Sequence, residues 1–468
     1  MLATVAPLFP YPRWLHPGDE AWQLTAATFV GLMSVPGLVV LYGGVMQKRW
    51  SVNRMMLTFM AFGLVLIAWT LWAFDMGFGH PIGSGTGFFS TFVGVPGSVL
   101  GQIAEQGQAH IPSIATNVGL PAFRFPQSSL VYFQFVFAAI TPILALGSIL
   151  GRVNFKAWIP FVLIWITVCY AVNAFLLWGG GFFAAHGALD FSGGYVIHLA
   201  AGVTGFVSAA VIGPRLARDR EIDAPNNLLM VATGGAILWL GWNGFNGGDP
   251  YFAGADASAA VLNTNLATAV AMLAWVGWDM IYKDKPGIIG TVNGMITGLV
   301  GITPCAGFVN GYGAIVVGLV CSTVVWMAIR YLSRVPPFSK VDDTLGVIYT
   351  HGIAGLIGGL LVGFLADGAM YEYGNYVHGK FVPVGSNLYG SVFYGGSWTQ
   401  LKWQALAALA IIVWDGVMTF VIWKLIGLFL PIREPDDVLE QGDAALHGHE
   451  VYPADVATLG GFGAPATA

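Results

Sequence analysis

The sequence predicts an all-α integral membrane protein with eleven transmembrane helices, arranged as two inverted five-helix repeats plus a C-terminal helix. Three observations support this prediction: the composition is strongly apolar, eleven segments are long and apolar enough to cross a bilayer, and one pattern of residues occurs twice. We expect the N-terminus outside and the C-terminus in the cytoplasm.

Composition sets the broad class of the protein. Charged residues make up 9% of the chain, hydrophobic residues 56%, and the mean hydropathy is +0.71. Soluble domains carry about 25% charged residues, so this chain is predicted to be a multi-pass membrane protein. No basic region indicates a nucleic-acid partner. Cys169, Cys305 and Cys321 lie in apolar runs without the spacing of a metal site, and we expect buried free thiols.

A bilayer-spanning helix needs about 20 predominantly apolar residues. The segments that meet this requirement are 22–45, 55–75, 128–150, 157–178, 192–213, 227–246, 260–282, 287–306, 312–333, 345–366 and 401–428. The first five segments form repeat one, about 22–213, and the next five form repeat two, about 227–366. Because each repeat has an odd number of spans, the second repeat is inverted relative to the first.

The remaining segments complete the predicted domain organisation. Residues 1–430 form the membrane domain, in which 401–428 is the extra helix. Residues 431–468 form an acidic cytoplasmic regulatory tail with seven acidic residues and one Arg. The loop 76–127 is rich in Gly, Ser and Pro, and we expect it to cap a vestibule, although loops of this length are also often functional.

The loops between the segments predict the orientation. Fifteen of the 19 Lys and Arg residues lie in the loops that follow odd-numbered segments. The four on the other side are Arg13, Arg124, Lys380 and Lys402. Positive charge marks cytoplasmic loops, so the side with fifteen basic residues is expected to face the cytoplasm.

The repeated pattern places a histidine inside the membrane twice. Asp190 precedes His198 by eight residues and Asp343 precedes His351 by eight, and Gly202 and Gly355 follow the histidines. Further landmarks precede each copy in the same order, Tyr42-Gly43-Gly44 and Ile140-Thr141-Pro142 for the first and Asn246-Gly247-Gly248 and Ile302-Thr303-Pro304 for the second. Duplication of this kind predicts a transport path at the interface of the two repeats.

We expect His198 and His351 to approach the membrane midplane from opposite sides, touch and share a proton. A single intramembrane histidine is more often a packing residue, but an inverted repeat brings equivalent residues together near its axis, and ionisable groups at that depth are by default functional. A zinc site is disfavoured because zinc takes four ligands and neither motif supplies them. Asp190 and Asp343 are expected to cap their helices, and Asp190 also to favour a cation outside its helix.

Aromatic residues stand out at the outer mouth. Phe137 lies just before Ile-Thr-Pro, Phe245 just before Asn-Gly-Gly, and Trp178 at the outer end of the fourth segment. Aromatic faces attract cations, and Asp249 lies immediately outside the sixth segment.

Together these residues resemble the ammonium transporter family (Amt/Mep/Rh) over about residues 18–452. The resemblance is carried by the stretch from Asp190 to Arg215, and by Gly37-Leu-Val-Val-Leu-Tyr-Gly-Gly44, Trp178-Gly-Gly-Gly, His186-Gly-Ala-Leu-Asp190, Gly241-Trp-Asn-Gly-Phe-Asn246, Leu262-Asn-Thr-Asn-Leu266, Lys285-Pro-Gly, Gly301-Ile-Thr-Pro304 and Val341-Asp-Asp through His351-Gly.

The resemblance implies a homotrimer in the cell membrane with one pore per subunit and no cofactor or metal. Trp178 and Phe137 would recruit ammonium or methylammonium beside Asp249, and Asp190 would lie beneath that site. Phe137 and Phe245 would form a stacked outer gate. His198 and His351 would be twin pore histidines, with Phe133, Gln134, Leu238, Trp242 and Thr303 at further pore or vestibule positions.

The chain departs from the family pattern at three places. Asp249 replaces the usual Ser of the recruitment site, and Leu41 replaces an aromatic residue that flanks the gate. The tail Glu440-Gln-Gly-Asp443 to Tyr452 lacks the central Leu of the regulatory tail, so docking of the tail and of a PII-type signalling protein is less securely implied.

The implied mechanism is capture of the cation, deprotonation near Asp190, and passage of neutral ammonia along the two histidines. The proton would cross separately, which makes transport electrogenic. The alternative is an ammonium sensor on the same fold, for which residues 431–468 are too few to hold a signalling domain. No nucleophile–base set or cofactor motif indicates an enzyme.

Overall fold

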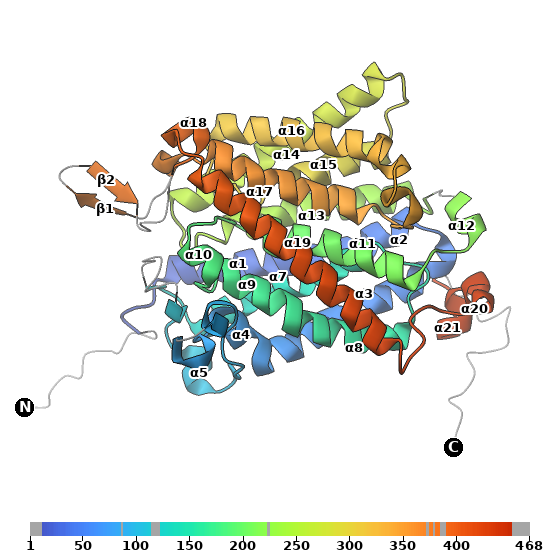
Figure 1. Ribbon diagram of the computed structural model, residues 1–468, viewed down its shortest axis with the longest axis horizontal. Coiled ribbons are helices and arrows are strands. Elements are labelled where there is room, and N and C mark those ends of the chain that lie inside the picture. Colours follow the sequence, from blue (N-terminus) through green and yellow to red (C-terminus); the bar gives the residue numbers. More distant parts are fainter. Residues whose placement is uncertain are drawn as a thin grey trace, which may run out of the picture.

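The computed structural model of the protein describes residues 12–85, 88–113, 122–221, 225–370, 374–377, 380–383 and 390–451. Long helices lie side by side along one direction, with short elements at the two ends of the bundle (Figure 1). In the part of the chain that the structure describes, ten helical stretches are long and apolar enough to cross a membrane, and one shorter apolar helix accompanies them.

The first repeat contains five of these stretches. The first, Pro17–Val45, consists of α1 (Pro17–Leu32), a π-helical turn (Met33–Gly37) and α2 (Leu38–Val45), and the second, Lys48–Phe78, of a 3-10 turn (Lys48–Trp50), α3 (Ser51–Ala68), a π turn (Trp69–Ala73) and α4 (Phe74–Phe78). The third is the single helix α7 (Gln127–Leu146). The fourth, Phe155–Ala185, consists of α8 (Phe155–Trp165), a π turn (Ile166–Tyr170), α9 (Ala171–Leu177) and α10 (Phe182–Ala185), and the fifth, Gly194–Ile212, of a π turn (Gly194–Leu199) and α11 (Ala200–Ile212).

The second repeat contains four more of these stretches and the shorter apolar helix α15, and the tenth stretch, α19, follows it. They are α13 (Leu228–Gly247), α14 (Ala255–Ile281), α15 (Ile288–Ile302), Gly311–Arg334 (α16, Gly311–Arg330; a 3-10 turn, Leu332–Arg334) and Ile348–Leu365 (a π turn, Ile348–Ile353; α17, Ala354–Leu365), followed by α19 (Thr399–Ile426). Each of the eleven predicted segments overlaps one of these stretches or α15.

Several predicted boundaries are wrong by a turn or more. The predicted segment 55–75 belongs to a stretch that begins at Lys48, and 128–150 belongs to a helix that ends at Leu146. The segment 287–306 is a helix only to Ile302. Pro304 follows at once, and proline has no backbone N–H and disfavours the helical conformation of the residue before it.

Short elements occupy the two ends of the bundle. One end carries α5 (Gln102–Gln106), α10, α18 (Val392–Gly395) and the hairpin of β1 (Gly374–Val377) and β2 (Lys380–Pro383); the other carries α12 (Ala217–Glu221), α20 (Asp436–Gln441) and α21 (Asp443–His447) (Figure 1). The antiparallel hairpin is a small addition to the predicted all-α architecture. The basic loops predicted to be cytoplasmic include α12, so the tail lies at the predicted cytoplasmic end.

The extra helix α19 crosses the bundle obliquely over α17, α9 and α8 (Figure 1). Two buried polar side chains hold it to α9, since Asn173 Nδ2 donates to Asp415 Oδ2 at 2.8 Å. Cys169, Cys305 and Cys321 are free and buried, as predicted. This buried hydrogen bond therefore links α19 to α9 within the apolar interior of the bundle.

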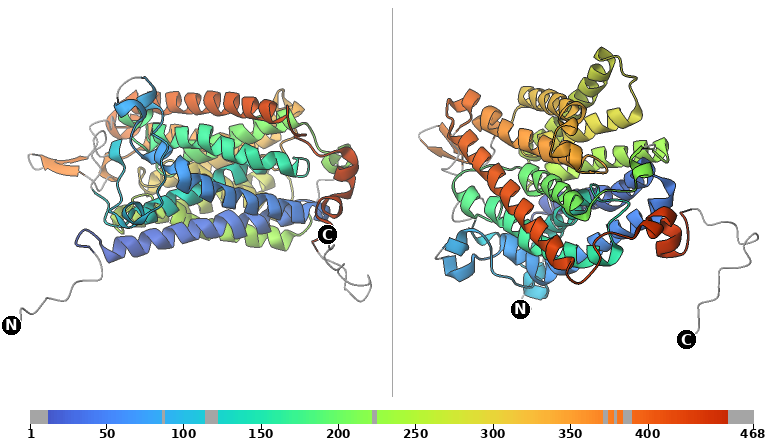
Figure 2. Two further views of the ribbon diagram at one scale, coloured as in Figure 1. Left: turned by 90° about the horizontal axis from the view of Figure 1, so that it is seen from below. Right: turned by 45° about the vertical axis from the view of Figure 1, so that its right-hand side comes forward.

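The tail folds back onto the start of α3. Its two short helices, α20 and α21, lie at this end of the bundle (Figure 2). Asp443 accepts hydrogen bonds from the backbone N–H groups of Val52 at 2.7 Å and Asn53 at 2.8 Å, so it caps the start of α3. Leu439 is fully buried there. Residues 452–468 of the predicted tail lie outside the described residues.

Candidate functional site

Asp190 and Asp343 each hold the start of the helical stretch that carries a histidine. The Asp190 carboxylate accepts four backbone N–H groups, from Gly193, Gly194, Tyr195 and Val196, at 2.6–3.1 Å. The Asp343 carboxylate accepts two, from Val347 and Ile348, at 3.1 and 2.9 Å. Both side chains therefore satisfy helix donors that would otherwise lie unpaired.

The two histidines are neighbours. The ring centroids of His198 and His351 lie 5.5 Å apart with the rings tilted by 53°. His198 is fully buried and His351 is 8% exposed. Among the described residues, neither ring nitrogen of His198 has a hydrogen-bond partner, whereas His351 Nδ1 lies 3.0 Å from Thr350 Oγ1. The imidazoles are thus adjacent without a direct hydrogen bond between them.

The glycines that follow the histidines explain this close approach. A Cβ atom on Gly202 would lie 2.4 Å from Gly352 Cα, and one on Gly355 would lie 2.5 Å from the Gly194 carbonyl oxygen. Both distances are too short for a carbon atom, so only glycine lets the backbones of the two stretches pass so closely. Small residues serve this purpose at many membrane helix contacts.

A row of aromatic rings leads to the histidines from the outer end. Phe137 and Phe245 are fully buried, and their ring centroids are 4.4 Å apart with a tilt of 49°. The two rings predicted to form a stacked gate are in contact with each other and tilted. Phe245 continues the row to His198, with centroids 5.7 Å apart and rings within 19° of parallel.

Trp178 begins the row. Its ring meets Phe137 edge to face, with centroids 6.4 Å apart. Its Nε1 donates to the backbone carbonyl of Asp190 at 2.7 Å, which fixes the orientation of the indole. Asp190 therefore serves two purposes, because its side chain caps the helix and its carbonyl positions Trp178. The resulting ring path runs Trp178, Phe137, Phe245, His198 and His351.

Asp249 is buried beside this path and is not turned outward into the loop. It is 9% exposed, and its Oδ2 has no hydrogen-bond partner among the described residues. Burial raises the pKa of Asp249 well above its ordinary value; the Ser192 hydroxyl counteracts this, and the Asp190 charge adds to it. A cation beside Asp249 would favour the ionised carboxylate, because opposite charges stabilise each other at low dielectric.

Gln134, expected at a pore or vestibule position, lies near two polar side chains that the sequence did not single out, Tyr170 and Tyr251. Gln134 Nε2 donates to the Tyr251 hydroxyl at 2.8 Å, and Gln134 Oε1 and the Tyr170 hydroxyl have no partner in the described part of the chain. Phe133 packs against Phe137 with centroids 4.8 Å apart. Tyr251 lies two residues after Asp249, and that proximity was the only signal in the sequence.

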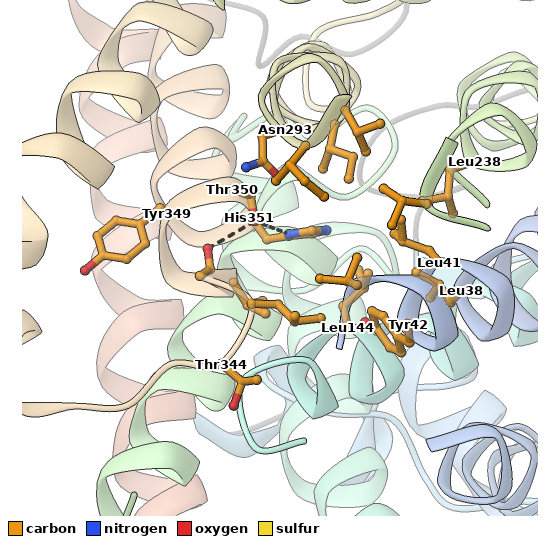
Figure 3. Close-up of a pocket in the computed structure, with 18 of the residues that line it drawn as sticks. Leu38, Leu41, Tyr42, Leu144, Leu238, Asn293, Thr344, Tyr349, Thr350 and His351 are labelled. Atoms are coloured by element: carbon orange, nitrogen blue, oxygen red, sulfur yellow. Dashed lines mark hydrogen bonds between the residues drawn. The ribbon is translucent and has the colours of Figure 1, made fainter. Parts of the chain in front are cut away.

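Beyond the histidines the path opens into a cavity of about 340 Å³, on the side predicted to face the cytoplasm. Leu38, Leu41, Tyr42, Leu144 and Leu238 surround it together with His351, and Asn293 adds a polar group (Figure 3). Leu41, predicted to replace a gate-flanking aromatic residue, lines this cavity. Trp242 also lines the cavity, and its Nε1 donates to Thr303 Oγ1 at 2.8 Å.

The arrangement has a clear chemical consequence. A buried row of rings with two imidazoles offers almost no replacement for the hydration shell of an ion, so a bare cation is excluded. A small neutral molecule that can donate to or accept from an imidazole fits the same path.

Comparisons with known proteins place the chain among membrane transporters. The sequence profile of the Ammonium Transporter Family matches residues 21–452. Ammonium transporter 3 member 2 of Oryza sativa subsp. japonica is 46% identical over 444 residues, which cover 94% of this chain and 90% of that protein. Ammonium transporter 2 of Arabidopsis thaliana is 45% identical over 443 residues, with coverage of 94% and 89%.

Solved structures share the fold. The crystal structure of Saccharomyces cerevisiae Mep2 matches with a TM-score of 0.74 at 27% identity and covers 89% of each chain. A structure described as Sensor Amt Protein matches with a TM-score of 0.74 at 21% identity, over 91% of this chain and 96% of that one, and shows a likeness of fold alone. These matches confirm the predicted class, an all-helical membrane protein with ten to eleven apolar spans.

Proposed function

The chain belongs to the ammonium transporter family, and from this premise we propose that it carries ammonium across the cell membrane through the ring path. The observation that supports this most directly is the buried row from Trp178 through Phe137 and Phe245 to His198 and His351. Membership of a family of transporters agrees with the expectation that the protein is not an enzyme.

Capture of the cation is assigned to Trp178, Phe137 and Asp249. The indole and phenyl rings offer their negative faces to a cation. The buried Asp249 Oδ2, which has no hydrogen-bond partner among the described residues, supplies a charge-assisted hydrogen bond, which is stronger than one to a hydroxyl. The carboxylate therefore strengthens binding relative to the serine that the family usually has there.

The selectivity for ammonium over potassium follows from the ability of ammonium to give up a proton. Moving a bare ion into a dry path costs tens of kcal/mol by Born estimates. The pKa of ammonium lies about two units above neutral, so giving up its proton costs roughly 3 kcal/mol at pH 7. Potassium has no such alternative. The ring path accordingly passes ammonia and rejects potassium, although the two cations have similar size and charge.

Asp190 acts on the deprotonation step through its charge. Its two oxygens already accept four backbone N–H groups, which makes the side chain a poor acceptor for a transferred proton. The ionised carboxylate instead stabilises the cation until the proton leaves. Ammonia then passes Phe137 and Phe245 and moves along His198 and His351, and the proton crosses separately through water and the imidazoles.

The orientation, the assembly and the partners complete the proposal. The positive charge of the loops supports an outer N-terminus and a cytoplasmic C-terminus. The resemblance supports a homotrimer with one pore per subunit. The tail from Arg433 to Glu450 presents a folded surface at the same end as the basic loops, where a PII-type signalling protein could bind.

Ammonium and methylammonium are expected to produce a saturable inward current in proteoliposomes, whereas potassium produces none. The reason is that ammonium and methylammonium can release a proton and potassium cannot. The measurement is the current after a substrate pulse, with protein-free liposomes as the control. Potassium currents of comparable size would contradict the deprotonation mechanism. Uptake without current would show neutral ammonia conduction, and binding without uptake would favour the sensor alternative.

Asp249→Ser is expected to raise the half-saturation concentration for ammonium several-fold while leaving the maximal current largely intact. The substitution removes a charge-assisted contact that acts on capture and not on passage. Because the pKa of Asp249 is raised, acidification of the outer side should also weaken capture by the unchanged protein as the carboxylate is protonated. Concentration series at several outer pH values check both effects, and an unchanged half-saturation in the variant would remove Asp249 from the capture site.

A further inference from the structure

A second cavity lies at the outer end of the bundle and shares no lining residue with the ring path. Its volume is about 740 Å³, and it is formed by the end of the second stretch, around α4, and by the outer loop that contains α5. Figure 1 places α4 and α5 next to each other at that end. Sites for small organic molecules have volumes of about 300–1,000 Å³, so this cavity is much larger than ammonium requires.

A single carboxylate in the lining favours the binding of cations in this cavity. Asp75 is the only acidic residue among the described residues that line the cavity, and no Lys or Arg lines it. Asp75 is partly buried, and its carboxylate makes no hydrogen bond to another described residue. A Cβ atom on Gly97 would lie 2.3 Å from Asp75 Oδ2, so a glycine at that position is what leaves room for the carboxylate.

The rest of the lining is mainly apolar and aromatic. Phe74 and Phe78 stack with centroids 5.4 Å apart, and both line the cavity. Leu100 and Ile103 line it from the loop side and are 54% and 85% exposed. Large apolar side chains left in water beside a carboxylate match a ligand that has a charged head and an apolar body.

Two imidazoles offer the competing explanation, in which Asp75 is balanced by the protein itself. His80 and His110 line the cavity and lie within electrostatic reach of the Asp75 carboxylate. Both are exposed and neither contacts the carboxylate by a hydrogen bond. An imidazole balances a carboxylate only in its charged imidazolium form.

We propose that this outer cavity is a binding site for organic ammonium ions with an apolar body, whose head group pairs with Asp75 and whose body packs on Leu100 and Ile103. Phe78 also stacks on Trp178, with centroids 6.4 Å apart and rings within 22° of parallel. Because Phe78 lies in the wall of the cavity, a ligand bound there shifts Phe78 and with it Trp178. Binding therefore changes the half-saturation concentration for ammonium, a consequence that rests on the proposed function.

The test is calorimetric titration of the purified full-length protein with 2-phenylethylammonium at pH 8, where free imidazole is neutral, in a buffer without ammonium. The unchanged protein should bind one equivalent. Asp75→Asn keeps the shape of the side chain and should weaken binding at least about tenfold, as expected for loss of a hydrogen-bonded charge. Ile103→Lys keeps the carboxylate, changes an exposed residue that folding does not depend on, and should weaken binding by repelling the ligand.

Asp249→Ser locates the bound ligand, because it removes a carboxylate from the ammonium path: loss of 2-phenylethylammonium binding in this variant would place the ligand in that path and not in the outer cavity. The proposal is overturned if the unchanged protein does not bind the ligand at millimolar concentration, if Ile103→Lys binds as tightly as the unchanged protein, or if Asp249→Ser abolishes binding. The titration needs no transport, so its failure is separable from failure of the proposed function.

Discussion

Replacing either His198 or His351 by Ala should reduce the selective ammonium current by about tenfold or more, and replacing both should add little to the loss of either one. The ring centroids of the imidazoles lie 5.5 Å apart, and His198 also packs against both Trp242 and Phe245, with centroids 5.3 and 5.7 Å away. Each substitution removes a hydrogen-bonding ring and opens space for water in a path that must stay dry. Residues in one network are strongly non-additive.

The measurement is the current of each single variant and of the double variant in proteoliposomes, for ammonium and for potassium. His186→Ala is a suitable control, because His186 packs on Trp403 and Phe182 near the outer end and is not part of the ring path. New potassium leakage in the pore variants would support the dry path in particular. If both pore variants kept the original current and selectivity, the two histidines would be packing residues.

Asp190→Ala should destabilise the protein far more than Asp343→Ala, although the two aspartates occupy equivalent positions in the repeats. Removing Asp190 leaves four N–H groups without their acceptor, and removing Asp343 leaves two. Each buried donor left unsatisfied costs about 1–3 kcal/mol, so the expected losses are about 4–12 kcal/mol for Asp190→Ala and about 2–6 kcal/mol for Asp343→Ala.

Thermal unfolding of the detergent-solubilised variants measures this difference. Asp190→Asn should fall between the unchanged protein and the alanine variant, because the amide keeps one acceptor oxygen. Alanine keeps the backbone carbonyl that orients Trp178 but loses the side-chain hydrogen bonds that hold this segment in place, so the alanine variant should also lose saturable ammonium uptake. Equal melting temperatures for Asp190→Ala and Asp343→Ala would show that the four contacts contribute little.

Most of the membrane architecture was predictable from the sequence, because hydropathy is a local property of the chain. A run of apolar residues has to cross the bilayer as a helix wherever it lies, so all eleven segments were found. Their ends were found less well. The second stretch begins at Lys48, ahead of the predicted 55, because Arg54 is buried and donates to the Tyr42 and Gln47 carbonyls. Asp443, almost 400 residues later in the sequence, caps the start of α3 by accepting a hydrogen bond from the backbone N–H of Val52.

The sequence by itself determined the fold class, the duplication and the pairing of His198 with His351, since a repeat with an odd number of spans relates equivalent residues by an axis in the membrane. Only the tertiary structure decided how the site is built. The tilt of Phe137 on Phe245, the hydrogen bond from Gln134 to Tyr251 and the cavity around Asp75 depend on contacts between helices and loops that lie far apart in the chain. Such contacts are set by side-chain packing across elements, and no local pattern records them.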